Sequence, residues 1–177
     1  MESVYKSIRV NCNAYFSPNN TYCSRIRKGV ENSMIQPDTI KLLRECDAGI
    51  KMGTASIHDV MDYVKDEDLK KLLEACKDKH RVLEREIEEL LASYGDDGKE
   101  PNPMAKGMSW MKTNVRLVMN ESDATIAGLM TDGCNMGVKS LGKYLNQYAA
   151  ADKEAKDITR RLMALEEQLA EDVRRFL

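Results

Sequence analysis

The sequence is poor in proline, aromatic residues and histidine. Its 177 residues include four prolines, two histidines and only 6% aromatic residues. The prolines, at positions 18, 37, 101 and 103, leave two proline-free runs, 38–100 and 104–177. Because proline breaks helix interiors, runs of this length favour long helices over a sandwich or barrel of short strands. Two histidines leave little room for a Ser-His-Asp system, and the sequence contains no P-loop or GxGxxG motif.

The charge balance and the lack of long apolar runs exclude further classes. A formal net charge of −2 gives no electrostatic reason to expect binding to nucleic acid or to a membrane. No apolar run reaches the ~18 residues of a membrane-spanning helix, and residues 1–6 lack the apolar region of a secretory signal. The five cysteines show no CxxC or CxxH spacing, which is typical of reduced thiols, so we expect a cytoplasmic protein.

Residues 1–33 differ from the rest of the chain. They hold five basic and two acidic residues and show no sustained apolar periodicity. We therefore expect a poorly ordered or loosely docked extension, followed by a single helical bundle over residues 34–177. Two alternatives stay open: a basic arm that touches nucleic acid, and an artefactual extension in which Met34 is the true initiator.

From Pro37 onward, apolar residues recur at alternating steps of three and four, the period of amphipathic helices. The pattern predicts a helix that begins at Pro37, with Asp38 or Thr39 as a cap. It predicts hairpins over 38–95 and 122–177, joined by a crossover at 96–121 that contains a short amphipathic helix at 104–119. The expected inward face of the second helix comprises Leu69, Leu73, Cys76, His80, Leu83, Ile87, Leu90 and Tyr94.

The two hairpins resemble each other in sequence. Residues 46–51 match residues 134–139 in the pattern C-x-x-G-[IV]-K, at an offset of 88. The apolar positions of the following helices align at an offset of 86, so the two-residue difference falls in the connecting turn, where a deletion costs least. These matches predict an internal duplication.

The hairpin, crossover and hairpin layout, together with the small-residue segment 132–137, resembles uncharacterised families of the ferritin-like superfamily. The resemblance implies an all-α fold: a ferritin-like four-helix up-down bundle of two duplicated hairpins, joined by a long crossover. Catalytic ferritin-like proteins hold two irons with a Glu from each of two helices and Glu-x-x-His from each of the other two. This chain departs from that pattern, because Lys77 stands three residues before His80, and Met163 and Glu166 occupy the corresponding positions of the fourth helix. We therefore do not carry over an oxidase or iron-storage activity.

Four residues keep a metal site open as an alternative. Asp47, His80, Glu84 and Glu166 could form a mononuclear site for iron or another transition metal, although Lys51 and Lys139 lie within the repeated segments and oppose a second cation. The favoured interpretation is that no metal or other cofactor binds and that His80 is a core residue hydrogen-bonded to a carboxylate. The acidic run from Glu84 to Glu89 is interpreted as a solvated outer face, and His58 as a surface or packed residue.

Cysteine, methionine and glycine each allow two interpretations. The cysteines at 46, 76 and 134, with the Met-rich stretch 104–136, are expected to fill the core, and Cu(I) binding is the alternative. The third helix contains four glycines, at 128, 133, 137 and 142, each costing about 1 kcal/mol relative to alanine. Close helix–helix approach is the expected compensation, and a break near Gly133 the alternative.

Together these observations predict a function without catalysis. We expect a structural or protein-interaction role for the bundle, with self-association into a dimer through the crossover helix that carries Trp110. The alternative is a metal-dependent redox or stress protein with an altered site.

Overall fold

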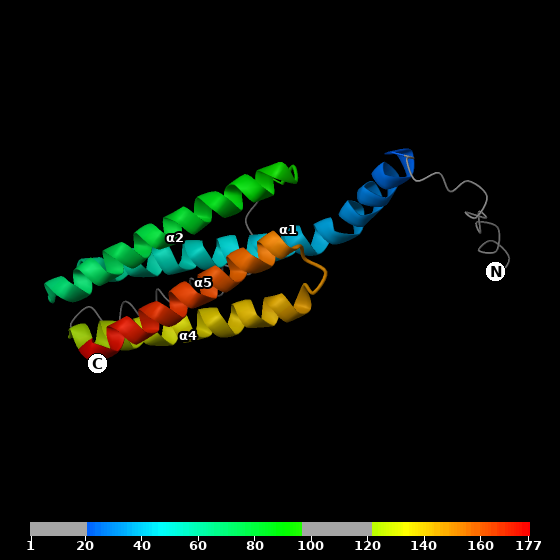
Figure 1. The fold of residues 1–177 in the computed structure, drawn as a ribbon. Coiled ribbons are helices and arrows are strands. Elements are labelled where there is room, and N and C mark those ends of the chain that lie inside the picture. The colour runs from blue at the N-terminus through cyan, green and yellow to red at the C-terminus, as the bar shows by residue number, and fades with distance from the viewer. Residues whose placement is uncertain (1–20, 97–121) are drawn as a thin grey trace. The chain divides into compact units, whose positions relative to one another are not determined.

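The computed structural model describes residues 21–96 and 122–177, with side chains from Pro37 onward. These residues form four α-helices, one 3-10 turn and no strand, so the expected all-α class is confirmed (Figure 1). The helices are α1 (Thr21–Met61), α2 (Glu67–Ser93), α4 (Asp123–Gln147) and α5 (Lys153–Asp172), followed by η1 (Val173–Phe176). The helix predicted at 104–119 lies outside the described residues. Contacts divide the chain into residues 1–34 and 35–177, and all contacts described below belong to the second unit.

The predicted turns end and start the helices as expected. Asp66 caps α2, because its side chain accepts hydrogen bonds from the backbone N–H groups of Asp68 and Leu69. Gly95 follows the end of α2 with φ of +71°, a conformation that favours glycine. Asp152 caps α5 by accepting a hydrogen bond from the N–H of Ala155.

The predicted start of the first helix at Pro37 is wrong. Helix α1 begins at Thr21, and Pro37 lies inside it. Proline has a φ compatible with a helix, so the backbone continues through Pro37 at the cost of one hydrogen bond. The two proposed caps contact another loop instead: Asp38 accepts from the N–H of Ala150 at 3.3 Å, and Thr39 accepts from the N–H of Asp152 at 2.9 Å.

A polar layer separates two apolar core clusters. One cluster contains Ile57, Cys76, Cys134 and Leu169, and the other contains Ile50, Leu83, Leu141 and Leu162. Each helix contributes one of these residues to each cluster, and the two are seven positions apart in the sequence. The positions between them include Gly53, His80, Gly137 and Glu166. The middle of the bundle is therefore where a polar site can form.

The two hairpins are each antiparallel, while α2 and α4 run in the same direction (Figure 1). Arg44 of α1 donates two hydrogen bonds to Asp96 just beyond α2, at 3.1 and 2.7 Å. Asp123, at the start of α4, accepts from the N–H groups of Lys65 and Asp66 in the α1–α2 turn. Asp96 and Asp123 consequently lie at opposite ends of the bundle.

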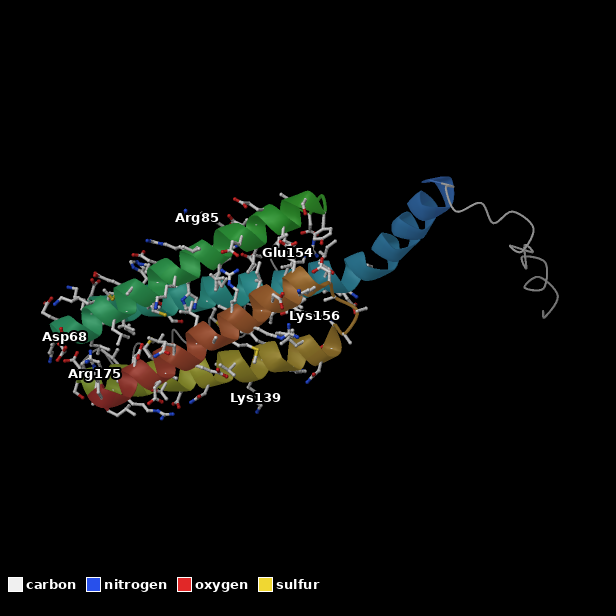
Figure 2. The ribbon with its side chains drawn as sticks, in the orientation of Figure 1. Asp68, Arg85, Lys139, Glu154, Lys156 and Arg175 are labelled. Atoms are coloured by element: carbon white, nitrogen blue, oxygen red, sulfur yellow. The ribbon has the colours of Figure 1, made fainter. Side chains whose placement is uncertain are left out.

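The outer faces of the helices are charged. In Figure 2 the labelled side chains Arg85 on α2 and Lys139 on α4 point away from the neighbouring helices, and both residues are exposed. Among residues 21–96 and 122–177, no helix combines the length and the apolarity needed to span a membrane.

Candidate functional site

His80 and Glu166 form a buried pair at the middle of the bundle. His80, on α2, is 1% exposed, and Glu166, on α5, is 12% exposed. Nε2 of His80 lies 2.9 Å from Oε1 of Glu166, and Nδ1 lies 3.0 Å from the carbonyl oxygen of Cys76, one helical turn earlier. Both ring nitrogens are therefore engaged by the protein itself.

The surroundings of His80 favour its protonated form. Burial alone lowers the pKa of the imidazole, but its hydrogen bonds to Cys76 and Glu166 and the charge of Glu166 outweigh burial and raise the pKa to about 10. At neutral pH both nitrogens thus carry a proton: one N–H donates to the Cys76 carbonyl and the other to the Glu166 carboxylate. The pair is an ion pair held inside the core.

Cys46, Cys76 and Cys134 are buried, and two of them, Cys46 and Cys134, hold their protons. Burial raises the pKa of the Cys46 thiol to about 12, although its contact with the Thr159 hydroxyl, 3.2 Å away, partly offsets this effect. Burial, and then the charge and hydrogen bonding of Glu166, raise the pKa of the Cys134 thiol well above its ordinary value. Cys76 is likewise a buried free thiol. Since the thiolate is the reactive form, neither Cys46 nor Cys134 is an activated nucleophile.

A partly open cavity of about 260 Å³ lies beside the ion pair, between α1 and α4. Helices α2 and α5 contribute His80 and Glu166 to its lining. The other lining residues are mainly apolar or small. The larger apolar ones include Met52, Met130, Met136, Leu141, Leu162 and Leu169. Glu45 of α1 also lines the cavity, so an apolar lining is combined with the His80–Glu166 pair and a second carboxylate.

Glycines on both sides of the cavity keep it open. A Cβ atom added at Gly49 on α1, or at Gly133 on α4, would meet no other atom within 4 Å. A Cβ at Gly53 would lie 3.4 Å from Nε2 of His80, and one at Gly137 would lie 3.7 Å from the Glu166 side chain. The first pair of glycines faces open space, and the second makes room for the ion pair.

The structure supports neither the expected role of the glycines in the third helix nor the alternative to it. Close helix–helix approach is not their role, because a Cβ at any of the four would come no nearer than 3.7 Å to a neighbouring atom. The helix is also unbroken at Gly133, since α4 runs continuously from Asp123 to Gln147. Gly133 and Gly137 instead line the cavity, where their missing side chains leave space.

The structure divides the four candidate ligands into two pairs. His80 and Glu166 contact each other, whereas Asp47 and Glu84 belong to a different cluster with Glu88. In the described part of the chain, no set of three potential ligand atoms within 4.8 Å of one another includes His80 or Glu166. The pair does not fit the di-iron pattern implied by the ferritin-like resemblance, because both nitrogens of His80 already have protein partners. His58 is exposed near the end of α1.

The sequence interpretation overlooked Glu88 and the cavity. Glu88 is exposed, as expected for the solvated face, but it also lies four residues after Glu84, a spacing that places both carboxylates on one side of α2. The sequence contains a weak indication of the cavity, because Gly49 and Gly53 on α1 repeat the spacing of Gly133 and Gly137 on α4. Such spacing is also found where helices pack closely, so it does not distinguish an open space from a tight contact.

Comparison with known proteins adds no family assignment: no protein-family model, no curated protein and no solved structure matches the chain. The function is therefore inferred from the geometry of the cavity and of the charged clusters.

Proposed function

We propose that the protein is a non-catalytic helical bundle that binds a small, mainly apolar molecule in the cavity between α1 and α4. The observation that carries this proposal is the open space in front of Gly49 and Gly133. Each glycine costs about 1 kcal/mol of helix stability relative to alanine, and no packing contact within the described chain requires its absent side chain. A ligand that occupies the space would account for both glycines.

The size and lining of the cavity define the ligand class. An apolar protein cavity of about 150 Å³ takes up benzene, so 260 Å³ suits a molecule of roughly ten non-hydrogen atoms. Pockets for small molecules are typically lined by apolar side chains with a few polar groups that fix orientation. Here Glu45 and Glu166 supply carboxylates, so an apolar molecule with a hydrogen-bond donor would fit best.

A small molecule is favoured over a protein partner by the described surface. Its large exposed hydrophobic residues are Val82, Met136 and Leu177, which lie on three different elements, α2, α4 and the chain terminus. A protein interface usually needs a contiguous apolar patch, and three scattered side chains do not provide one. The expected dimer contact through Trp110 lies outside the described residues and stays a prediction.

The way in which the reactive groups are used supports a role without catalysis. A general base needs an accessible lone pair, but the protonated imidazole of His80 donates through both nitrogens. The thiol of Cys134 lines the cavity but is held in its protonated form. The His80–Glu166 pair accordingly orients a ligand and stabilises the core, and neither His80 nor Cys134 offers it a base or a thiolate nucleophile.

We further propose that the bundle is ferritin-like, with duplicated halves, and that it is cytoplasmic. The opposite placement of Asp96 and Asp123 supports a connection that traverses the bundle, as in ferritin-like folds with one long crossover. The three buried free cysteines are compatible with a reducing compartment. The alternative of a redox metal at His80 receives no such support.

Binding of indole, an apolar molecule with one N–H donor, tests the proposed ligand class. The methyl groups of Met52 and Met130 line the cavity, so methionine methyl NMR reports binding there directly. We expect both signals to shift during an indole titration. The melting temperature should rise as well, because ligand at one hundred times its Kd stabilises a protein by about 2.7 kcal/mol.

A matched pair of variants assigns the binding to the cavity. In Gly133→Leu the new side chain enters the cavity, so the indole-dependent shifts should disappear. In Asn135→Leu the same side chain is added on the exposed face of α4, and the shifts should persist. Unchanged methyl signals up to the solubility limit of indole, or shifts that survive in Gly133→Leu, would refute the proposal. A cavity filled by another part of this chain would give the first of these results.

A further inference from the structure

Three carboxylates converge between α1 and α2, away from the cavity lining. They are those of Asp47, Glu84 and Glu88, and one oxygen of each lies within 4.8 Å of the others. Asp47 is buried, Glu84 half-buried and Glu88 exposed, so the cluster extends from the core to the surface. Glu84 and Glu88 are one helical turn apart on α2 and face the same side.

The innermost carboxylate is incompletely satisfied. Asp47 is only 2% exposed, and its Oδ2 accepts a hydrogen bond from the Lys51 ammonium at 2.8 Å. Its Oδ1 is also buried and has no hydrogen-bond partner among the described residues. Buried polar atoms are normally paired, so an orphaned carboxylate oxygen within an acidic cluster indicates a missing positively charged or hydrogen-bonding group.

Lys51 balances only part of the charge of this cluster. Its ammonium lies 2.8 Å from Oδ2 of Asp47, within the field of the Glu84 and Glu88 carboxylates. One ammonium against three carboxylates leaves an excess of two negative charges. The Lys51 side chain is 39% exposed, so it can move into solvent when another cation takes its place.

We propose that Asp47, Glu84 and Glu88 bind a divalent cation that prefers oxygen ligands, such as Mg²⁺, Mn²⁺ or Ca²⁺, with Lys51 as a displaceable internal counter-ion. Carboxylate oxygens are the ligands that these hard cations select, and water completes their coordination when the protein offers few groups. The site contains no sulfur or imidazole donor, which disfavours soft metals. It is independent of the cavity, because none of the three carboxylates lines it.

Titration of the metal-free protein with Mn²⁺, with free Mn²⁺ measured by electron paramagnetic resonance, tests this site. We expect one Mn²⁺ per chain with a dissociation constant below 1 mM. Glu84→Gln should weaken binding about tenfold or more, since it removes a charged ligand while Asp47 and its buried surroundings stay intact. Lys51→Met should strengthen binding about tenfold, because it removes the competing ammonium.

Controls separate a built site from incidental binding. Glu89→Gln removes a charge from the exposed surface of α2 and should leave the affinity unchanged. Gly133→Leu should also leave it unchanged, whether or not the cavity binds a small molecule. No stoichiometric binding below 1 mM, or equal weakening by Glu84→Gln and Glu89→Gln, would show an adventitious ion only and overturn the proposal. Circular dichroism of each variant verifies that the helices are retained.

Discussion

Filling the space in front of the two open glycines by one methyl group each should stabilise the protein. The relevant change is Gly49→Ala combined with Gly133→Ala, on the two helices that enclose the cavity. In a helix interior, glycine is less favourable than alanine by about 1 kcal/mol because it loses more backbone freedom on folding. At both positions the added Cβ meets no atom within 4 Å, so no steric cost opposes this gain.

The expected magnitude is about 2 kcal/mol for the double variant. The two effects should add, because neither new methyl group contacts the other or any shared neighbour. For a protein of this size, each kcal/mol raises the melting temperature by about 2–4 °C, so the double variant should melt about 4–8 °C higher. Gly53→Ala is the matched contrast. Its Cβ would lie 3.4 Å from Nε2 of His80 and 3.6 Å from Oε1 of Glu166, so crowding of the ion pair should cancel most of the helix gain.

Urea unfolding monitored by circular dichroism measures these differences directly. The slope of the free energy against urea concentration should stay constant across the variants, which would show that only stability has changed. Destabilisation by Gly49→Ala or Gly133→Ala would refute the reasoning, because it would mean that the space is already filled. Equal stabilisation at all three positions would show instead that Gly53 has no special relation to the ion pair.

Two further predictions concern the ion pair and the oligomeric state. The pKa of His80 is raised to about 10 in the folded protein, whereas that of an unfolded histidine is about 6.5. The stabilisation from protonated His80 is therefore complete below about pH 6.5 and is lost as the pH rises through about 10. Urea unfolding at pH 6.5, 8 and 10 should show this loss, and Glu166→Gln should reduce it; the same pH dependence in both proteins would assign it to other groups. In analytical ultracentrifugation, the predicted self-association should give a species of twice the 20.1 kDa chain mass, whereas a monomer mass at every concentration would contradict it.

The sequence predicted the helices and their faces because both depend on local patterns. The expected face of α2 contains six buried residues, from Leu69 to Ile87, and its last two members, Leu90 and Tyr94, are half-buried. Caps such as Asp66 and Asp152 were predictable for the same reason, since a short polar side chain before an apolar periodic run satisfies free N–H groups. Pro37 misled the prediction, because proline is compatible with both a helix start and a helix interior.

The candidate sites were less predictable because they depend on distances between helices. Sequence spacing identified His80 and Glu166 as polar residues on inward faces. It could not show that these two residues contact each other, or that Asp47 belongs to a different cluster. The pairing of Asp47 with Glu84 and Glu88 depends on the relative rotation of α1 and α2, which no local pattern specifies. The cavity depends on the separation of α1 and α4, and a glycine is equally compatible with a tight contact and with an open space.

The contact between His80 and Glu166 also bears on the proposed duplication. Under the offset of 86 that aligns the second and fourth helices, these two residues occupy equivalent positions, and they lie 2.9 Å apart. Equivalent residues of two duplicated halves contact each other only close to the axis that relates the halves. Identical residues at such a position would place two like charges or two imidazoles face to face in the core. Once the halves are fused in one chain they can diverge, and an imidazolium opposite a carboxylate removes that conflict. The pair thus supports the duplication more specifically than the six-residue repeat does.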